Sequence, residues 1–335
     1  MAKQVTMKDI AQAMGVSIVS VSKALSGKDG VSDELRADIM SKADEMGYLA
    51  KEDKKKKIAS SSNIAIFIAE RFVDDRSFYV TIYQQMIMEF SSRGLIAIVE
   101  IIRDEDERSG TLPVSIQTRT VSQAVIVGEM KSVFLDSIRE SGTDMVFFDF
   151  EKDDFDADTV VGDNLSGGYT MTRYLVNNGY SEIAYVGNIR ATTNILDRFM
   201  GFLKYLLAHG MKFDRTWVID DRSDENVDID ITLPKKMPQA FFCNCDKTAY
   251  RLIQTLNDAG YKVPEDVSVV GYDDYAPVIP EGVELTTYKV DTDEMIHQCA
   301  HIVHQRSLNP SYKRGNALVK GSLVERKSVD TDKHK

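Results

Sequence analysis

Residues 6–25, TMKDIAQAMGVSIVSVSKAL, decide the fold of the amino-terminal part of the chain. Thr6 suits the N-cap of a helix, because its side-chain oxygen can accept hydrogen bonds from the amides of the first turn. Ile10, Ala13 and Met14 follow at helical spacing and predict one apolar face. The stretch is therefore expected to begin with a short amphipathic helix.

A second helix is expected after a tight turn. Gly15 can adopt the left-handed conformation that ends the first helix, and Ser17 can cap the second. Val21, Ala24 and Leu25 then recur on one face. Two helices joined in this way form a helix-turn-helix, whose second helix enters the major groove of DNA. An ordinary helical hairpin in an all-α domain would show the same periodicity.

The order of residue types resembles the DNA-binding headpiece of the LacI/GalR (lactose-repressor) family. The family pattern is roughly T-x-x-D-I/V-A-x-x-A/M-G-V-S-x-x-T/S-V-S-R/K-x-L, and residues 6–25 match it in register. The match continues through residues 31–48, where Ser32 is expected to cap a third helix. The resemblance implies a sequence-specific DNA-binding headpiece over residues 1–49.

The start of the second helix is implied to read the DNA. Ile18 and Val19 occupy the positions that face base edges, where apolar side chains contact thymine methyls or exclude other bases. Lys23 is the candidate for a polar or phosphate contact. Packing inside the headpiece is the alternative for Ile18. The expected DNA-binding residues of the headpiece are Thr6, Ser17, Ile18, Val19, Ser20, Ser22, Lys23 and Tyr48.

The net charge of −11 is unevenly distributed along the chain. Residues 1–60 hold 11 Lys and Arg against 9 Asp and Glu, 11 − 9 = +2, and the remainder holds 30 against 43, 30 − 43 = −13. Because an acidic surface repels phosphates, DNA contact is expected only from the amino-terminal part.

Residues 50–62 form a charged linker that ends in a serine run. In the family this region folds on DNA into a hinge helix, and its leucine wedges into the minor groove. Here Ala50, Lys51, Lys54 and Lys57 stand where Pro, Asn, Ala and Leu are expected. Lys54 and Lys57 are therefore candidates for salt-sensitive phosphate contacts, and a solvated linker is the alternative.

From residue 63 onward, apolar runs alternate with helical patterns, which is typical of a doubly wound α/β fold with parallel sheets. The first expected set has strands at 64–68, 96–101, 124–127 and 145–150 and helices at 78–93 and 132–141. The second expected set has strands at 159–161, 183–186, 240–243 and 267–271 and helices at 168–178, 198–209 and 247–259.

The second half of the chain carries the family's sensor motifs. Residues 161–169 match V-x-x-D-N-x-x-G-G, residues 198–202 match R-x-x-G-F, and residues 263–274 match the last block. The resemblance implies a two-lobed, periplasmic-binding-protein-like sensor. Its lobes are expected at residues 63–160 with 289–318 and at residues 161–288 with 319–330.

A ligand of such a sensor lies between the lobes, at the carboxyl ends of the strands. Arg198, at the expected start of its helix, matches the family's ligand-binding arginine, whose planar fork suits vicinal hydroxyls or a carboxylate. Asp149 and Asp273 end strands and can accept hydrogen bonds from sugar hydroxyls, and a structural role at the strand end is the alternative. Phe78 and Tyr79 can stack on a ring or pack in the core. The effector-binding candidates are Phe78, Tyr79, Asp149, Asn194, Arg198, Arg222, Cys245 and Asp273.

Two of these candidates depart from the family pattern. Cys245 replaces a common asparagine, which removes a polar contact made by sugar-binding members. Arg222 stands where an aromatic residue is frequent. An additional cation can indicate an anionic ligand, and a surface salt bridge is the alternative.

The sequence shows no pattern of catalytic residues, and no enzyme activity and no cofactor are expected. Cys243 and Cys245 form a C-x-C pair, a weak metal signal, and buried reduced cysteines are the favoured interpretation. His297 and His301 share a helical face without a third ligand. The amino terminus lacks a signal-peptide pattern, and no apolar run is long enough for a membrane helix, so a cytoplasmic protein is expected.

These observations predict a homodimeric transcriptional regulator, most simply a repressor. It would bind a near-palindromic double-stranded DNA operator and respond to a small effector, with a carbohydrate as the first expectation. A solute-sensing module whose headpiece no longer reads DNA is one alternative. A regulator controlled by a protein corepressor is another.

Overall fold

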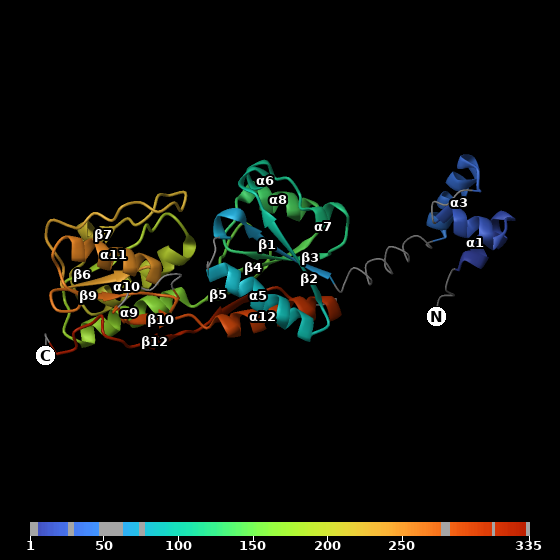
Figure 1. Cartoon of the computed structure of the whole chain (residues 1–335). Helices are drawn as coiled ribbons and strands as arrows, with labels where there is room; N and C mark the ends of the chain where they lie inside the picture. The colour runs from blue at the N-terminus through green and yellow to red at the C-terminus, as the bar shows by residue number, and fades with distance from the viewer. Residues whose placement is uncertain are drawn as a thin grey trace. The chain divides into compact units, whose positions relative to one another are not determined.

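The computed structural model describes residues 6–25, 30–46, 63–73, 78–275, 282–309 and 312–332. The chain divides into two compact units, Met1–Ser62 and Asn63–Lys335 (Figure 1). Among the helices in the described ranges, none has the length and apolar character needed to cross a membrane. The predicted Tyr48, Lys54 and Lys57 contacts lie outside the described residues.

Within residues 6–25 and 30–46, the described part of the first unit, the helices are α1 Met7–Met14, α2 Ile18–Leu25 and α3 Asp33–Glu45. Thr6 caps α1 through a reciprocal pair with Asp9, since the Thr6 amide donates to the Asp9 carboxylate at 2.7 Å and the Asp9 amide donates to the Thr6 hydroxyl at 3.4 Å. Gly15 ends α1 with a φ of 66°. The predicted helix-turn-helix is therefore confirmed.

A small apolar core holds the three helices together. It consists of buried Ile10, Ala11, Val21, Ala24, Ile39 and Ala43. The prediction that Ala13 belongs to the apolar face is wrong: Ala13 is exposed, because the side of α1 that meets the other helices runs through Ile10 and Ala11. Arg36 on α3 donates to the carbonyl oxygens of Lys23 at 3.2 Å and Ala24 at 3.1 Å, and so satisfies acceptors at the end of α2.

The second unit contains a six-stranded parallel sheet in the order β11-β5-β4-β3-β1-β2. Alternate residues of β1 face opposite cores. Ile64 and Ile66 pack with α5 and α12, whereas Ala65 and Phe67 pack with α8, so helices cover both faces (Figure 1). The elements are β1 Asn63–Ala69, β2 Ile96–Ile102, β3 Gln123–Val127, β4 Asp144–Phe148, β5 Asp158–Gly162, β11 Asn316–Val319, α5 Phe78–Ser92, α8 Ser132–Glu140 and α12 Thr292–Leu308.

A second parallel sheet has four strands in the order β7-β6-β8-β9. Strands β10 and β12 form a separate antiparallel pair. The elements are β6 Ile183–Val186, β7 Val218–Ile219, β8 Ala240–Cys243, β9 Ser268–Val270, β10 Thr287–Lys289, β12 Ser322–Val324, α9 Asn164–Asn177, α10 Thr193–Ala208 and α11 Asp246–Asp258. Shorter helices complete the unit: α6 Asp104–Ser109, α7 Val114–Gln117, η1 Glu70–Phe72 and η2 Arg215–Trp217.

Strand β5 corrects one prediction. It was expected to begin the second set, but it pairs with β4 and β11 in the six-stranded sheet. Phe147 and Phe148 of β4 lie beside Thr159 and Val160, and this continuous ladder holds β5 in the first sheet. The expected lobe boundary between residues 160 and 161 therefore falls inside a strand of that sheet.

The helices α9 and α10 begin earlier than predicted because both have capping side chains. Asp163 accepts from the amide of Ser166 at 3.0 Å, and Thr192 accepts from the amide of Ile195 at 3.3 Å. Arg198 therefore lies in the second turn of α10 and not at its start, which corrects the sequence prediction.

Glycines allow α9 and α10 to approach closely. A Cβ atom on Gly168 would lie 2.1 Å from the carbonyl oxygen of Arg198, and one on Gly201 would lie 2.1 Å from that of Leu165. Neither distance is compatible with a larger residue unless the helices separate. This contact fixes the backbone that carries Arg198.

Candidate functional site

A cavity of about 340 Å³ lies in the second unit, lined by residues that follow strands of both sheets. Its size is at the lower end of the range for small-molecule pockets. The lining brings together all eight effector-binding candidates from the sequence: Phe78, Tyr79, Asp149, Asn194, Arg198, Arg222, Cys245 and Asp273. The lining residues that sequence reasoning did not identify are Arg71, Phe72, Glu129, Phe150, Thr192, Thr193, Ile195, Asn226, Asp228, Asn244, Lys247 and Tyr275.

Arg198 is buried, and each guanidinium nitrogen has an acceptor. Nε donates to Oδ1 of Asn164 at 2.8 Å, Nη1 donates to the carbonyl oxygen of Asn244 at 2.7 Å, and Nη2 lies 3.1 Å from Oδ1 of Asp273. The guanidinium also lies over the ring of Tyr272, 3.9 Å from its centroid. Burial opposes the charged form, but Asp273, Tyr272, Asp149 and Tyr185 together outweigh it and raise the pKa of Arg198. Arg198 is therefore a fixed cation in the cavity wall.

The two strand-end carboxylates differ in their partners. Asp149 accepts from the hydroxyl of Tyr79 at 2.7 Å and from Nδ2 of Asn194 at 3.1 Å. Burial raises the pKa of Asp149, against the opposing effect of Arg198. Burial also raises the pKa of Asp273, to about 6, although Arg198 favours its ionised form. Both residues have positive φ, 65° for Asp149 and 100° for Asp273, so the chain turns sharply at each strand end.

An aromatic cluster forms another part of the wall. The ring centroids of Phe72 and Tyr79 are 4.9 Å apart, and those of Phe78 and Tyr275 are 5.5 Å apart. Phe72, Phe78 and Tyr79 follow β1 in the first sheet, whereas Tyr275 follows β9 in the second. Phe78 and Tyr79 pack against the core and also line the cavity, and their stacking on a ring stays a prediction.

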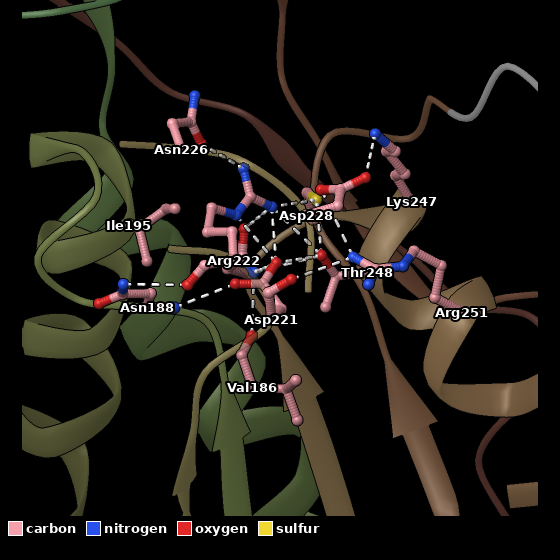
Figure 2. A network of polar contacts seen from close by, with 12 residues as sticks. Val186, Asn188, Ile195, Asp221, Arg222, Asn226, Asp228, Lys247, Thr248 and Arg251 are labelled. Atoms are coloured by element: carbon pink, nitrogen blue, oxygen red, sulfur yellow. Dashed lines mark hydrogen bonds and ion pairs between the residues drawn. The ribbon is translucent and has the colours of Figure 1, made fainter. Parts of the chain in front are cut away.

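Arg222 forms an ion pair, but not on the surface as the alternative interpretation held. Its Nη2 atom lies 2.6 Å from Oδ2 of the fully buried Asp221, and its side chain is only 14% exposed. Figure 2 shows the guanidinium between Asp221 and Asn226. Asp221 and Arg222 follow shortly after β7, and Asp221 bonds to Asn188 and Asn244, which follow the neighbouring strands β6 and β8.

Asp221 and Asn244 form a polar junction that sequence reasoning missed. Asn244 donates from Nδ2 to Oδ2 of Asp221 at 2.9 Å and to the carbonyl oxygen of Val186 at 3.0 Å. Its Oδ1 accepts from Arg222 at 3.2 Å, while its backbone accepts from Arg198. Asp221 and Asn244 follow β7 and β8 closely, so the rule that selected Asp149 as a strand-end residue could have found both.

Cys245 lies at the start of α11 and lines the cavity. Its Sγ lies 3.3 Å from Oγ1 of Thr248 and accepts from Arg222 at 3.5 Å. Cys243 and Cys299 are buried, as predicted for cysteines of a reduced core. Over the described ranges, no group of three or more His, Cys, Asp and Glu side chains is arranged to hold a metal ion.

The recognition helix α2 presents two of the predicted DNA-reading residues to solvent. Ile18 is 48% exposed and Val19 is 64% exposed, so packing inside the headpiece does not account for Ile18. Ser17 caps α2 by accepting from the amide of Ser20 at 3.0 Å and Ser22 is also exposed. Both apolar side chains are therefore accessible to a partner, as the predicted contact with thymine methyl groups requires.

Both parts of the chain are similar to known bacterial proteins. Residues 6–50 match the family described as bacterial regulatory proteins, lacI family, and residues 172–329 match the periplasmic binding protein-like domain. The HTH-type transcriptional repressor PurR of Mannheimia succiniciproducens is 22% identical over 331 residues, which cover 97% of this chain and 98% of the relative. PurR of Erwinia tasmaniensis is 25% identical over 333 residues, with 97% and 96% covered.

Solved structures share the fold. A complex of the transcriptional regulator CelR with cellobiose has a TM-score of 0.68 at 22% identity and covers 97% of this chain and 100% of its own. The lac repressor dimer bound to operator and the anti-inducer ONPF has a TM-score of 0.65 at 20% identity, with 97% and 99% covered. A ribose-bound LacI family regulator from Enterococcus faecium has a TM-score of 0.64 at 19% identity, with 79% and 98% covered.

A helix-turn-helix headpiece followed by a two-sheet sensor with a polar cavity defines a DNA-binding transcriptional regulator with an effector domain. The chain combines a DNA-binding domain of the lacI family of bacterial regulatory proteins with a periplasmic binding protein-like domain.

Proposed function

We propose that the chain is a homodimeric repressor whose operator affinity is set by a small polyhydroxylated effector, with a sugar as the first candidate. The observation that carries this proposal is the convergence of Arg198, Asp149 and Asp273 on one cavity. Asp149 follows β4 of the first sheet, Asp273 follows β9 of the second sheet, and Arg198 lies on α10. We propose that the two sheets act as two lobes. An effector that prefers one arrangement of the lobes shifts the population toward it.

The lining favours a sugar for chemical reasons. Carboxylates such as Asp149 and Asp273 accept hydrogen bonds from hydroxyl groups, and aromatic faces such as those of Phe78 and Tyr275 suit the C–H faces of a sugar ring. Two similar regulators are known in complex with cellobiose and with ribose. The similarity supports the ligand class and leaves the particular sugar to experiment.

Repression and dimerisation are inferred from the headpiece and from the relatives. The similar proteins from Mannheimia and Erwinia are named repressors, and the lac repressor structure is a dimer on its operator. Two headpieces on a near-palindromic operator share the binding energy, which a single three-helix headpiece would have to supply alone. From DNA binding we also infer that the protein works in the bacterial cytoplasm.

Operator binding tests the first half of the proposal. An operator is obtained by in vitro selection with the full chain, and we expect an enriched near-palindrome. Replacing Ile18 and Val19 together by Asp should weaken operator binding by roughly 100-fold or more, because two carboxylates then face the phosphates. Met40→Asp on α3, also an exposed apolar position of the headpiece, is the control and should bind nearly normally.

Effector binding tests the second half. Isothermal titration of the full chain against neutral mono- and disaccharides should give a hit that Arg198→Lys weakens and that changes operator affinity. Enrichment of an operator without any small-molecule hit would support the alternative of a protein corepressor. Failure to enrich any DNA sequence would contradict the proposed function.

A further inference from the structure

Arg222 is the lining cation that the sequence offers as a partner for an anionic effector. We propose that Asp221 prevents this by neutralising Arg222 from behind the cavity wall, so that the cavity selects an uncharged ligand and rejects a phosphorylated or carboxylated one. The inference rests on the proposed function, because it concerns the effector cavity of the same sensor.

The geometry places the carboxylate on the protein side of Arg222. Asp221 is fully buried and is not part of the cavity lining. Its Oδ2 atom accepts from both Nε, at 3.0 Å, and Nη2, at 2.6 Å, of Arg222. The remaining nitrogen, Nη1, donates to Oδ1 of Asn226 at 3.0 Å (Figure 2). The guanidinium therefore has an acceptor at each nitrogen before any ligand enters.

Asp221 is itself held in its ionised form. Oδ1 accepts from the amide of Asn188 at 3.0 Å, and Oδ2 accepts from the hydroxyl of Thr248 at 2.5 Å and from Nδ2 of Asn244. Burial alone would raise the pKa, but the bonds to Arg222 and to these donors lower the pKa of Asp221 to about 2. The pair is consequently neutral as a whole at every pH at which the protein works.

The other lining cations are compensated in the same way. Arg71 pairs with the buried Glu107, Arg198 pairs with Asp273 at 3.1 Å, and Lys247 pairs with Asp228 at 2.6 Å. An anion would have to displace one of these carboxylates and leave it without its partner, which costs more than the new contact returns. A hydroxyl group meets no such penalty, since it can donate to one member of a pair and accept from the other.

Asp221 is the position where this balance can be changed without moving the cation. In Asp221→Asn the side chain keeps its shape, and Arg222 retains the neutral acceptors Asn226, Asn244 and Thr248. The variant therefore presents one uncompensated positive charge to the cavity. Inorganic phosphate is a suitable probe, because it reports this charge without knowledge of the natural effector.

The experiment measures phosphate binding to the full chain by isothermal titration at low ionic strength. We expect weak binding to the unmodified protein and about tenfold tighter binding to Asp221→Asn, a gain that corresponds to about 1.4 kcal/mol. The gain should disappear in the double variant Asp221→Asn with Arg222→Gln. Asp224→Asn also removes one carboxylate, but one outside the cavity lining, which pairs with Arg190 and is 57% exposed; it should give little gain, because solvent screens an exposed charge.

Equal phosphate affinity of the unmodified protein and Asp221→Asn would overturn the proposal, and so would an equal gain in Asp224→Asn. If Asp221→Asn alone does not fold, as judged by circular dichroism, the double variant with Arg222→Gln decides, because it replaces the ion pair by two neutral side chains. A neutral pair contributes little to anion affinity, so the double variant should bind phosphate as the unmodified protein does, and a clear loss would contradict the inference. Neither measurement uses an operator or a sugar, so failure of the proposed function would be seen separately.

Discussion

Asn194 on α10 donates from Nδ2 to Asp149 at the end of β4 twice, to the carbonyl oxygen at 2.8 Å and to the carboxylate at 3.1 Å. Its Oδ1 accepts from Asn164 at 3.0 Å, and Asn164 accepts from Nε of Arg198 at 2.8 Å. The hydroxyl of Tyr79 completes the path on the far side of Asp149. A continuous chain of hydrogen bonds therefore joins the arginine beside the second sheet to the first sheet, through the cavity wall.

Removing the amide of Asn194 should interrupt this connection. We expect Asn194→Ala to lower the free energy of unfolding by about 1–3 kcal/mol, because the variant loses bonds to a carboxylate. Effector affinity should also fall, since the two sheets must then approach without this bond. Asn178→Ala is the control, because its amide bonds only within the end of α9, to the Tyr174 carbonyl. Unchanged effector affinity in Asn194→Ala would show that the connection is not used.

Arg198 is expected to dominate the stability of the site. In Arg198→Met the carboxylate of Asp273 and the acceptors on Asn164 and Asn244 lose their partner, so the free energy of unfolding should fall by about 3–5 kcal/mol. Arg198→Lys restores the charge but not the planar fork and should recover only part of the loss. Urea unfolding measures both. Arg139→Met, which breaks an ion pair whose arginine is 53% exposed, should cost less than about 1 kcal/mol.

A substitution at the close contact of α9 and α10 tests the site without removing any polar group. Gly201→Ala puts a methyl group against the carbonyl oxygen of Leu165 and should cost about 1–3 kcal/mol, because the helices must separate. Arg198 moves with α10, so effector affinity should fall together with stability. At Gly315 an added Cβ meets nothing within 4 Å, and Gly315→Ala should behave almost normally in both thermal unfolding and titration.

Sequence patterns predicted the parts of the fold that depend on local chemistry. The apolar runs at β1, β3, β6 and β8 were found within about two residues, because a strand buried on both faces needs a continuous run of apolar residues. The eight cavity residues could be collected because parallel strands all place their carboxyl ends at one edge.

The remaining features depend on contacts that no local pattern records. The sheet to which β5 belongs is decided by its pairing with β4 and β11, and neither the two-residue β7 nor the short β11 carries a strand signal of its own. For the same reason, no local pattern could decide whether Arg222 binds an anionic ligand or forms a salt bridge. Whether its charge is available to a ligand depends on Asp221, the preceding residue, turning inward beneath it.

Asp246 provides a test of the buried electrostatics that does not depend on any ligand. It is the first residue of α11, and its carboxyl group accepts from the hydroxyl of Thr287 at 2.6 Å and from the amide of Tyr275 at 2.9 Å. Burial nevertheless dominates and raises the pKa of Asp246 from 3.8 to about 8. The folded protein therefore holds a proton that the unfolded chain has already released at neutral pH.

Stability should consequently fall as the pH rises through this window, since the folded state binds more protons than the unfolded state between about pH 4 and pH 8. Between pH 6.5 and pH 9, above the pKa of about 6 that applies to Asp273, the unmodified protein should lose on the order of 1–2 kcal/mol relative to Asp246→Asn. The variant cannot ionise at this position, so its own free energy of unfolding should change less over the same range. Urea unfolding at each pH measures the difference. Parallel curves for the two proteins would mean that Asp246 is ionised in the folded state at neutral pH, and that Thr287 and the Tyr275 amide outweigh its burial.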